Sequence, residues 1–179
     1  MQNELEVRFT LNGESVWAMV QPEISLLTLL KNLGVNSVKQ ACVGGECGAC
    51  TVLIDGVAMN SCLVMALTVE GKDITTLEGV GTLENMHPLQ VAFVETGGSQ
   101  CGFCTPGFIM SAVGLLSKNP NPTVKEIREA LSGNLCRCTG YVRPVKAIEI
   151  AAEAMAAGDD AITAIKSAAE KLNAELERR

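Results

Sequence analysis

Eight cysteines are the residues of this sequence best suited to chemistry, and their positions divide them into two sets of four with none left over. No export signal is apparent, and thiols in such numbers then favour metal binding over disulfides. The partition predicts two separate metal-thiolate sites. The first set is Cys42, Cys47, Cys50 and Cys62, and the second is Cys101, Cys104, Cys136 and Cys138.

The first set has a diagnostic spacing. Three cysteines follow the pattern Cys-x4-Cys-x2-Cys and the fourth lies alone, which is the plant-type 2Fe-2S arrangement. Gly44, Gly45 and Gly48 lie between them and permit the positive φ angles of a loop that wraps closely around a cluster. A zinc site, the alternative, prefers two short-spaced pairs, whereas here three candidate ligands share one loop. The spacing therefore predicts a 2Fe-2S cluster on Cys42, Cys47, Cys50 and Cys62.

The second set, Cys-x2-Cys followed later by Cys-x-Cys, is less diagnostic by itself. Iron-sulfur is favoured, and zinc stays open as the alternative. Each pair precedes an apolar run with helix-start signals: Thr105 as N-cap and Pro106 at the first helical position, and Pro144 in the first turn of the other run. Thiolates at these places lie near positive helix ends, which favour an anionic metal-sulfur centre.

The segments before each pair also have helical patterns. Pro88 to Thr96 predicts a helix that ends at Gly97, and the capping box of Thr123 and Glu126 opens a helix that ends at Gly133. Together with the two apolar runs, these segments predict an all-α unit of four helices. We expect the four thiols of the second set to converge at one end of it.

The first half of the chain has the patterns of a small sheet. Alternating apolar residues surround the turn at Asn12-Gly13, and a second hairpin, 51–54 and 57–61, surrounds Asp55-Gly56. Ser25 can cap a short leucine-rich helix that ends at Gly34. Further short strands are expected at 66–69 and 74–77. These elements predict a mixed α/β domain that carries the first cysteine set.

The fold class predicted is therefore α+β, with three divisions. They are a domain over residues 1–80, an all-α domain over 84–157 and a C-terminal helical extension over 158–179. Ile162, Ile165, Ala169, Leu172 and Leu176 form an apolar stripe on the extension. Two interpretations of that helix remain open: packing on its own chain, or docking on another subunit.

Bulk properties exclude several functions. The formal net charge of -6 and the 3% aromatic content argue against nucleic-acid binding. No apolar run reaches the roughly 18 residues of a membrane span, and no signal peptide is recognisable. We therefore expect a cytoplasmic protein without a membrane span, although such a chain can also be exported as the passenger of a partner.

Four motifs, in order, carry a resemblance to a known family. They are ACVGGECGACTV, HPLQ, QCGFCTPGF and IREALSGNLCRCTGY. Over about residues 5–156 the chain resembles the small iron-sulfur subunit, or the equivalent N-terminal region, of molybdenum hydroxylases of the xanthine dehydrogenase and aldehyde oxidoreductase type. The resemblance implies a β-grasp, ferredoxin-like first domain and an all-α second domain, each with one 2Fe-2S cluster.

The resemblance also implies partners and residue roles. Gln100 and Cys138 match positions beside the pterin of a molybdenum cofactor held by a large subunit, and FAD is expected on a medium subunit. The chain is then the electron-transfer subunit of a molybdenum-dependent oxidoreductase, with no substrate site of its own. The alternatives are a free-standing two-cluster ferredoxin and a zinc-stabilised interaction module. Without the family, Gln100 is interpreted as a polar cap of a turn, and His87 as a packing or capping residue.

Overall fold

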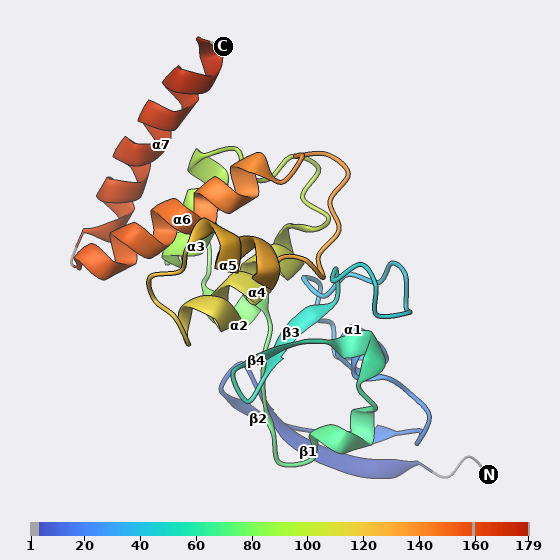
Figure 1. Ribbon diagram of the computed structural model, residues 1–179. Helices are drawn as coiled ribbons and strands as arrows, with labels where there is room; N and C mark the ends of the chain where they lie inside the picture. The colour runs from blue at the N-terminus through green and yellow to red at the C-terminus, as the bar shows by residue number, and fades with distance from the viewer. Residues whose placement is uncertain (1–3, 159, 179) are drawn as a thin grey trace.

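A small sheet and a group of helices form the two halves of the molecule (Figure 1). The computed structural model describes residues 4–158 and 160–178; residues 1–3, 159 and 179, which belong to the predicted divisions 1–80 and 158–179, lie outside that description. The α+β class predicted from the sequence is confirmed. Both cysteine sets lie on segments where the halves approach each other, so the fold is described mainly for how it positions them.

Five strands form one sheet in the order β2-β1-β5-β3-β4. Strands β1 and β5 run parallel, and the other neighbouring pairs are antiparallel. Asn12-Gly13 and Asp55-Gly56 have positive φ at both positions, which matches the right-handed twist of the strands they connect. Both predicted hairpins are therefore present. The bounds are β1 Leu5–Leu11, β2 Glu14–Val20, β3 Thr51–Ile54, β4 Val57–Asn60 and β5 Asp73–Thr75.

Helix α1 (Leu26–Asn32) covers one face of this sheet. Ser25 Oγ accepts a hydrogen bond from the Thr28 amide at 3.2 Å, so the predicted cap is present. The helix buries four leucines against the strands. The resulting core includes Val7, Phe9, Val20, Leu26, Leu27, Leu29, Leu30, Val52 and Ile74.

One strand prediction is wrong. Residues 66–69 form a short 3-10 helix, η2 (Ala66–Val69), which follows another, η1 (Ser61–Leu63). Ala66 and Val69 are both fully buried, and residues three apart lie on one side of a 3-10 helix but on opposite faces of a strand. The last predicted strand is shorter than expected, because it ends at Thr75 and Leu77 begins a short helix, α2 (Leu77–Val80).

Four helices of the other half occur where the sequence predicts them. His87 caps the first: its Nδ1 accepts from the Leu89 amide at 3.2 Å, and Gln90 Oε1 accepts from the His87 amide at 2.8 Å. Thr123 and Glu126 form the predicted capping box of the third. His87 therefore acts as a cap, as its position indicated. The bounds are α3 Pro88–Glu95, α4 Thr105–Leu116, α5 Val124–Ala130 and α6 Val142–Ala157.

The start of α4 differs by one residue from the prediction. Cys104 occupies the N-cap position, and Thr105 is already helical. The Thr105 hydroxyl donates instead to Ser99 Oγ at 2.9 Å, in the loop before the first cysteine of this set. The Thr105 hydroxyl therefore bonds to the preceding loop and does not cap the helix.

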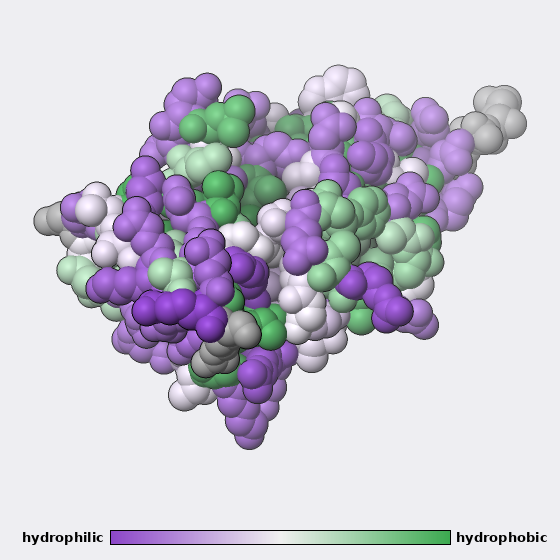
Figure 2. Space-filling model, turned by 90° about the horizontal axis from the view of Figure 1, so that it is seen from above, coloured by the Kyte–Doolittle hydropathy of each residue, from purple (hydrophilic) through white to green (hydrophobic). Residues whose placement is uncertain are grey.

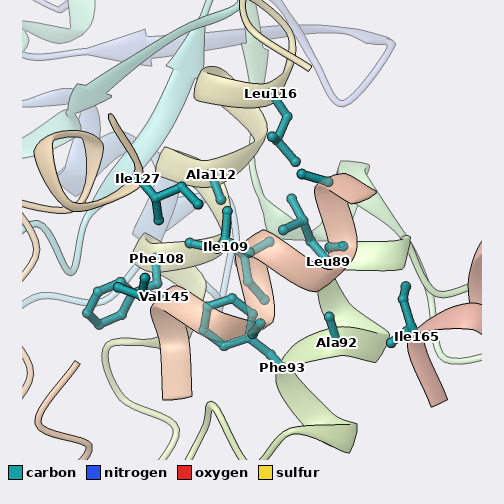
Figure 3. Close-up of a cluster of buried hydrophobic side chains, with 14 of the residues drawn as sticks. Leu89, Ala92, Phe93, Phe108, Ile109, Ala112, Leu116, Ile127, Val145 and Ile165 are labelled. Atoms are coloured by element: carbon teal, nitrogen blue, oxygen red, sulfur yellow. The ribbon is translucent and has the colours of Figure 1, made fainter. Parts of the chain in front are cut away.

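Side chains from all these helices meet in a second core (Figure 3). The ring centroids of Phe93 and Phe108 lie 6.5 Å apart, and Phe108 meets Tyr141 edge-on at 5.9 Å. Helix α7 (Ala161–Glu177) packs on α3 and α6 of its own chain and extends beyond them at one end (Figure 1). It contributes Ile165 and Ala169 to buried positions.

The face of the molecule seen in Figure 2 is mainly hydrophilic, with apolar side chains in small separate patches. Among the described helices, none has both the length and the apolar character needed to cross a membrane. The apolar residues of this chain are used mostly in the two cores, which hold the cysteine-bearing segments in place.

Candidate metal centres

The loop that carries most of the first cysteine set folds through left-handed backbone conformations. Val43, Gly45 and Gly48 all have positive φ, so the chain turns sharply between Cys42 and Cys50. The fourth thiol of the set lies on η1, immediately after β4. A Cβ on Gly45 would lie 2.4 Å from the Leu63 side chain, which covers the loop there. The sequence predicted positive φ angles at Gly44, Gly45 and Gly48, and the structure shows them at Gly45 and Gly48.

Backbone amides surround one thiol of this set. The N-H groups of Gly44 and Cys47 both donate to Cys42 Sγ at 3.4 Å. These donors, the Cys47 amide first, lower the pKa of Cys42 to about 6. At the inner side of the loop, burial and then the nearby Cys50 thiol raise the pKa of Cys62 to about 11. The loop therefore stabilises negative charge on its exposed side.

The second set is brought together by two helix starts. Cys101 and Cys104 come just before α4, while Cys136 and Cys138 precede α6. The Cys138 thiol donates to Cys101 Sγ at 3.6 Å, which makes an exposed pair. The other two cysteines form a more buried pair. The structure thus places the four thiols around one cavity, at the starts of two of the four predicted helices.

The inner pair is electrostatically unequal. Burial, followed by the Cys136 thiol, raises the pKa of Cys104 to about 12. Burial also acts to raise the pKa of Cys136, but the Thr139 hydroxyl, which donates to Cys136 Sγ at 3.2 Å, and nearby backbone amides outweigh it and lower that pKa to about 7. Thr139 is a polar contact of this site that sequence reasoning did not identify.

The close contacts of the thiols are pairwise. Within residues 4–158 and 160–178, no three His, Cys, Asp or Glu side chains close on the position of one metal ion. Two thiolates on one tetrahedral metal lie about 3.7 Å apart when each metal-sulfur bond is about 2.3 Å, and the Cys101–Cys138 separation is 3.6 Å. Four thiols in two pairs therefore fit a group with two metal atoms, each held by one pair.

One cavity joins the two cysteine sets. It has a volume of about 520 Å³, and its walls include Cys47 of the first set and all four thiols of the second. Phe103, Leu135 and Tyr141 supply apolar and aromatic surface around it, and Arg137 adds a positive charge. Segments almost ninety residues apart in the sequence thus line a single depression, which no local pattern predicted.

One backbone hydrogen bond connects the two sets directly, and two further bonds hold the segment around Cys136. The Leu135 amide donates to the Cys47 carbonyl at 2.9 Å, one residue before Cys136. The Cys136 amide donates to Tyr141 Oη at 2.9 Å, and the Tyr141 hydroxyl donates to the Asn134 carbonyl at 3.2 Å. Asn134 and Tyr141 both belong to the motif IREALSGNLCRCTGY, but no local pattern predicted these contacts.

Gln100 lies at the exposed edge of the second set. It is exposed and directly precedes Cys101, which contacts Cys138. The two residues that the family resemblance placed beside a partner's cofactor, Gln100 and Cys138, therefore lie close to the same exposed thiol. This edge is exposed in the part of the chain that the structure describes, 4–158 and 160–178.

A carboxylate anchors the start of the first loop. Glu78 Oε1 accepts from the amides of Asn36 and Ser37 at 3.0 and 2.9 Å, and its other oxygen accepts from the hydroxyls of Ser37 and Thr76. Burial acts to raise the pKa of Glu78, but these donors outweigh it and lower the pKa to about 2. Glu78 lies on α2, so it connects the end of the first half to the approach of the cysteine loop.

Glu78→Gln is expected to destabilise the protein at neutral pH by about 1 kcal/mol, because the carboxylate is partly exposed and its hydrogen bonds are screened by solvent. A lowered pKa stabilises the fold above the unfolded value near 4.5, and this stabilisation is lost as pH falls toward 2. Thermal unfolding of both proteins from pH 7 to pH 3 should show the difference shrinking. Glu14→Gln on exposed β2 is the control for charge, and a pH-independent difference would contradict the assignment.

Comparisons with known proteins agree with this geometry. Residues 9–79 match the family model described as a 2Fe-2S iron-sulfur cluster binding domain, and residues 76–149 match a second, described as a 2Fe-2S binding domain. The nicotinate dehydrogenase small FeS subunit of Eubacterium barkeri is 45% identical over 84% of this chain and 97% of its own. The xanthine dehydrogenase iron-sulfur-binding subunit of Escherichia coli O157:H7 is 48% identical over 76% and 87%.

A solved structure is similar over almost the whole chain. The crystal structure of quinoline 2-oxidoreductase from Pseudomonas putida 86 contains a chain that is 38% identical, with a TM-score of 0.80, over 96% of this chain and 98% of that one. The similarity therefore spans both halves of the molecule, including the two segments that carry the cysteine sets.

Proposed function

Since this chain belongs to the iron-sulfur subunits of the xanthine dehydrogenase and aldehyde oxidoreductase family, we propose that it relays electrons from the molybdenum-pterin site of a large subunit toward FAD or another acceptor. The observation that carries the proposal is the cavity that all four thiols of the second set share with Cys47 of the first. The chain itself supplies ligands, spacing and partner contacts; we assign it no catalytic residue.

Each set of thiols is proposed to hold one 2Fe-2S cluster, which when bound supplies a one-electron carrier. The paired arrangement supports this, because two pairs suit two tetrahedral metal atoms. In the second set we propose Cys101 with Cys138 on one metal and Cys104 with Cys136 on the other. In the first set we propose Cys42 with Cys47, and Cys50 with Cys62.

The exposed edge of the second set is proposed to face the pterin of the large subunit. Gln100, Cys101 and Cys138 are all exposed, which suits groups that meet a partner's cofactor. The first set is proposed to lie toward an FAD-binding medium subunit. Between the sets, the hydrogen bond from the Leu135 amide to the Cys47 carbonyl gives a short bonded connection to Cys136.

We also propose the division of the chain that the sequence suggested. A β-grasp, ferredoxin-like domain (1–80) is followed by a helical domain (84–157) and an extension (158–179). The element order supports it, since β1 to β5 precede α3 and α7 begins at Ala161. Eight cysteines arranged for metal binding support a cytoplasmic location, where thiols stay reduced.

The test is low-temperature electron paramagnetic resonance (EPR) of the dithionite-reduced protein, purified with the subunits that accompany it, together with metal analysis. We expect two distinct 2Fe-2S signals, about four iron atoms per chain at two per cluster, and molybdenum in the complex. Two signals in a protein that purifies without a molybdenum subunit would support the free-standing two-cluster ferredoxin instead. Zinc in place of iron at the second set would overturn the proposal.

A further inference from the structure

Asn134 lies at the contact between the two halves, which we call the seam, where Gly48 approaches Gly107 and Gly133. Both ends of its side-chain amide form hydrogen bonds there. Its Nδ2 donates to the Gly48 carbonyl at 3.0 Å and lies 3.4 Å from Thr51 Oγ1. Its Oδ1 accepts from the Ser111 hydroxyl at 2.7 Å. The residue is 3% exposed. One side chain therefore connects the first cysteine loop and the start of β3 to helix α4.

The seam leaves no room for a side chain at Gly107 or Gly48. A Cβ on Gly107 of α4 would lie 2.3 Å from the Gly48 carbonyl oxygen, and a Cβ on Gly48 would lie 2.3 Å from the Gly133 carbonyl. The backbones of the two halves are thus in direct contact at this point. The hydrogen bonds of the Asn134 amide hold the segments at this close approach.

The chemistry of the amide also sets its orientation. The Gly48 carbonyl can only accept a hydrogen bond, so it must face the Nδ2 of Asn134. The Ser111 hydroxyl donates to the opposite end of the same amide. The Gly48 carbonyl also accepts from the Thr51 amide at 3.2 Å and from the Thr51 hydroxyl at 2.7 Å. An aliphatic side chain at position 134 would therefore remove one of its donors and would take from the buried Ser111 hydroxyl its acceptor; a buried polar group left unpaired costs about 1–3 kcal/mol.

The backbone of Asn134 extends the connection to the second cysteine set. Its carbonyl accepts from the Tyr141 hydroxyl, whose oxygen accepts from the Cys136 amide. The next amide, that of Leu135, donates to the Cys47 carbonyl. Asn134 therefore contacts, directly or through one residue, the segments that carry both sets of thiols.

We propose that Asn134 is a positioning residue that sets the distance and relative orientation of the two cysteine sets, and so the rate at which electrons pass between their clusters. This rests on the proposed function for its consequence, but the junction itself is a property of the chain. Ser111 supports Asn134 by holding the Oδ1 end of its amide.

The test compares Asn134→Ala with Asn119→Ala in the holo complex. Asn119 is a suitable control because its amide hydrogen-bonds Glu126 within the helical half. For Asn134→Ala we expect both cluster signals and the iron content to remain, while the magnetic interaction between the two reduced clusters in EPR weakens. Hydrogen exchange of the Leu135 amide should become about tenfold faster, because the bonds from Asn134 to the Gly48 carbonyl and from the Ser111 hydroxyl to Asn134 are lost and the seam opens more often.

The proposal is overturned if Asn134→Ala leaves both the magnetic interaction and the exchange of the Leu135 amide unchanged. It is also overturned if this variant loses a cluster while exchange at Leu135 stays normal. If Asn134→Ala does not fold, Ser111→Ala is the deciding variant. We expect it to change the magnetic interaction and the exchange of the Leu135 amide in the same direction but by less. If neither changes in Ser111→Ala, the proposal is overturned. The two proposals fail separately. A wild-type protein without two iron-sulfur signals would refute the function, whereas the exchange measurement still tests the junction.

Discussion

Cys47→Ser is expected to eliminate one 2Fe-2S signal and about half of the iron, while the other signal remains. Cys47 belongs to the loop of the first set, and serine oxygen is a poor substitute for a thiolate ligand of iron. Its backbone carbonyl, which accepts from the Leu135 amide, is unchanged by the substitution. The second set should therefore keep its cluster, and molybdenum should still be reduced by substrate. EPR with iron analysis of the purified complex measures both effects.

Glu46→Gln is the matched control for this experiment. It lies beside Cys47 on the same exposed loop and changes a side chain without removing a thiol. Both signals should persist in that variant. If Cys47→Ser instead removed the signal of the second set, the partition into 42, 47, 50, 62 and 101, 104, 136, 138 would be wrong.

Gly107→Ala is expected to have the largest effect on stability. In most exposed helix positions this change stabilises by up to about 1 kcal/mol. Here the new Cβ would lie 2.3 Å from the Gly48 carbonyl oxygen and 3.1 Å from Asn134 Nδ2. Neither the backbone of the first loop nor the buried amide can move freely, so we expect destabilisation of about 2–3 kcal/mol. This corresponds to a fall of about 5–10 °C in the midpoint of thermal unfolding.

Gly133→Ala provides the comparison, because a Cβ there meets nothing within 4 Å. Its effect should stay within about 0.5 kcal/mol, as for most exposed substitutions. An increase in thermal stability for Gly107→Ala would show that the two halves do not approach as closely as described. A fall of similar size in both variants would point to a general loss of backbone freedom rather than to the seam.

Local features of this protein follow from residues close together in the sequence. The caps at Ser25, His87 and Thr123 and the turn at Asn12-Gly13 each depend on a few neighbouring residues. Their physics is short-range: a side chain reaches an amide two or three residues away, or a glycine permits a positive φ. For the same reason the helices before and after each cysteine pair lie where the patterns predicted them.

The departures depend on contacts and burial in the folded chain that the local patterns did not specify. Thr105 was expected to cap α4, yet its hydroxyl contacts Ser99. Residues 66–69 were expected to form a strand, yet burial of both Ala66 and Val69 favours a 3-10 helix. The pattern of the C-terminal helix left two interpretations open, and its packing through Ile165 against α3 and α6 is a contact that the pattern alone did not specify.

The sequence by itself determined the chemistry of the candidate sites: two sets of four thiols, glycines where a loop must wrap closely, and helix starts beside the second set. Only the tertiary structure decided that Cys47 lines one cavity with the second set and that Asn134 connects Gly48 with Ser111. Asn134 and Gly48 are 86 residues apart, and neither has a pattern that names the other. A contact of this kind exists only once both cores have packed and brought the two backbones together.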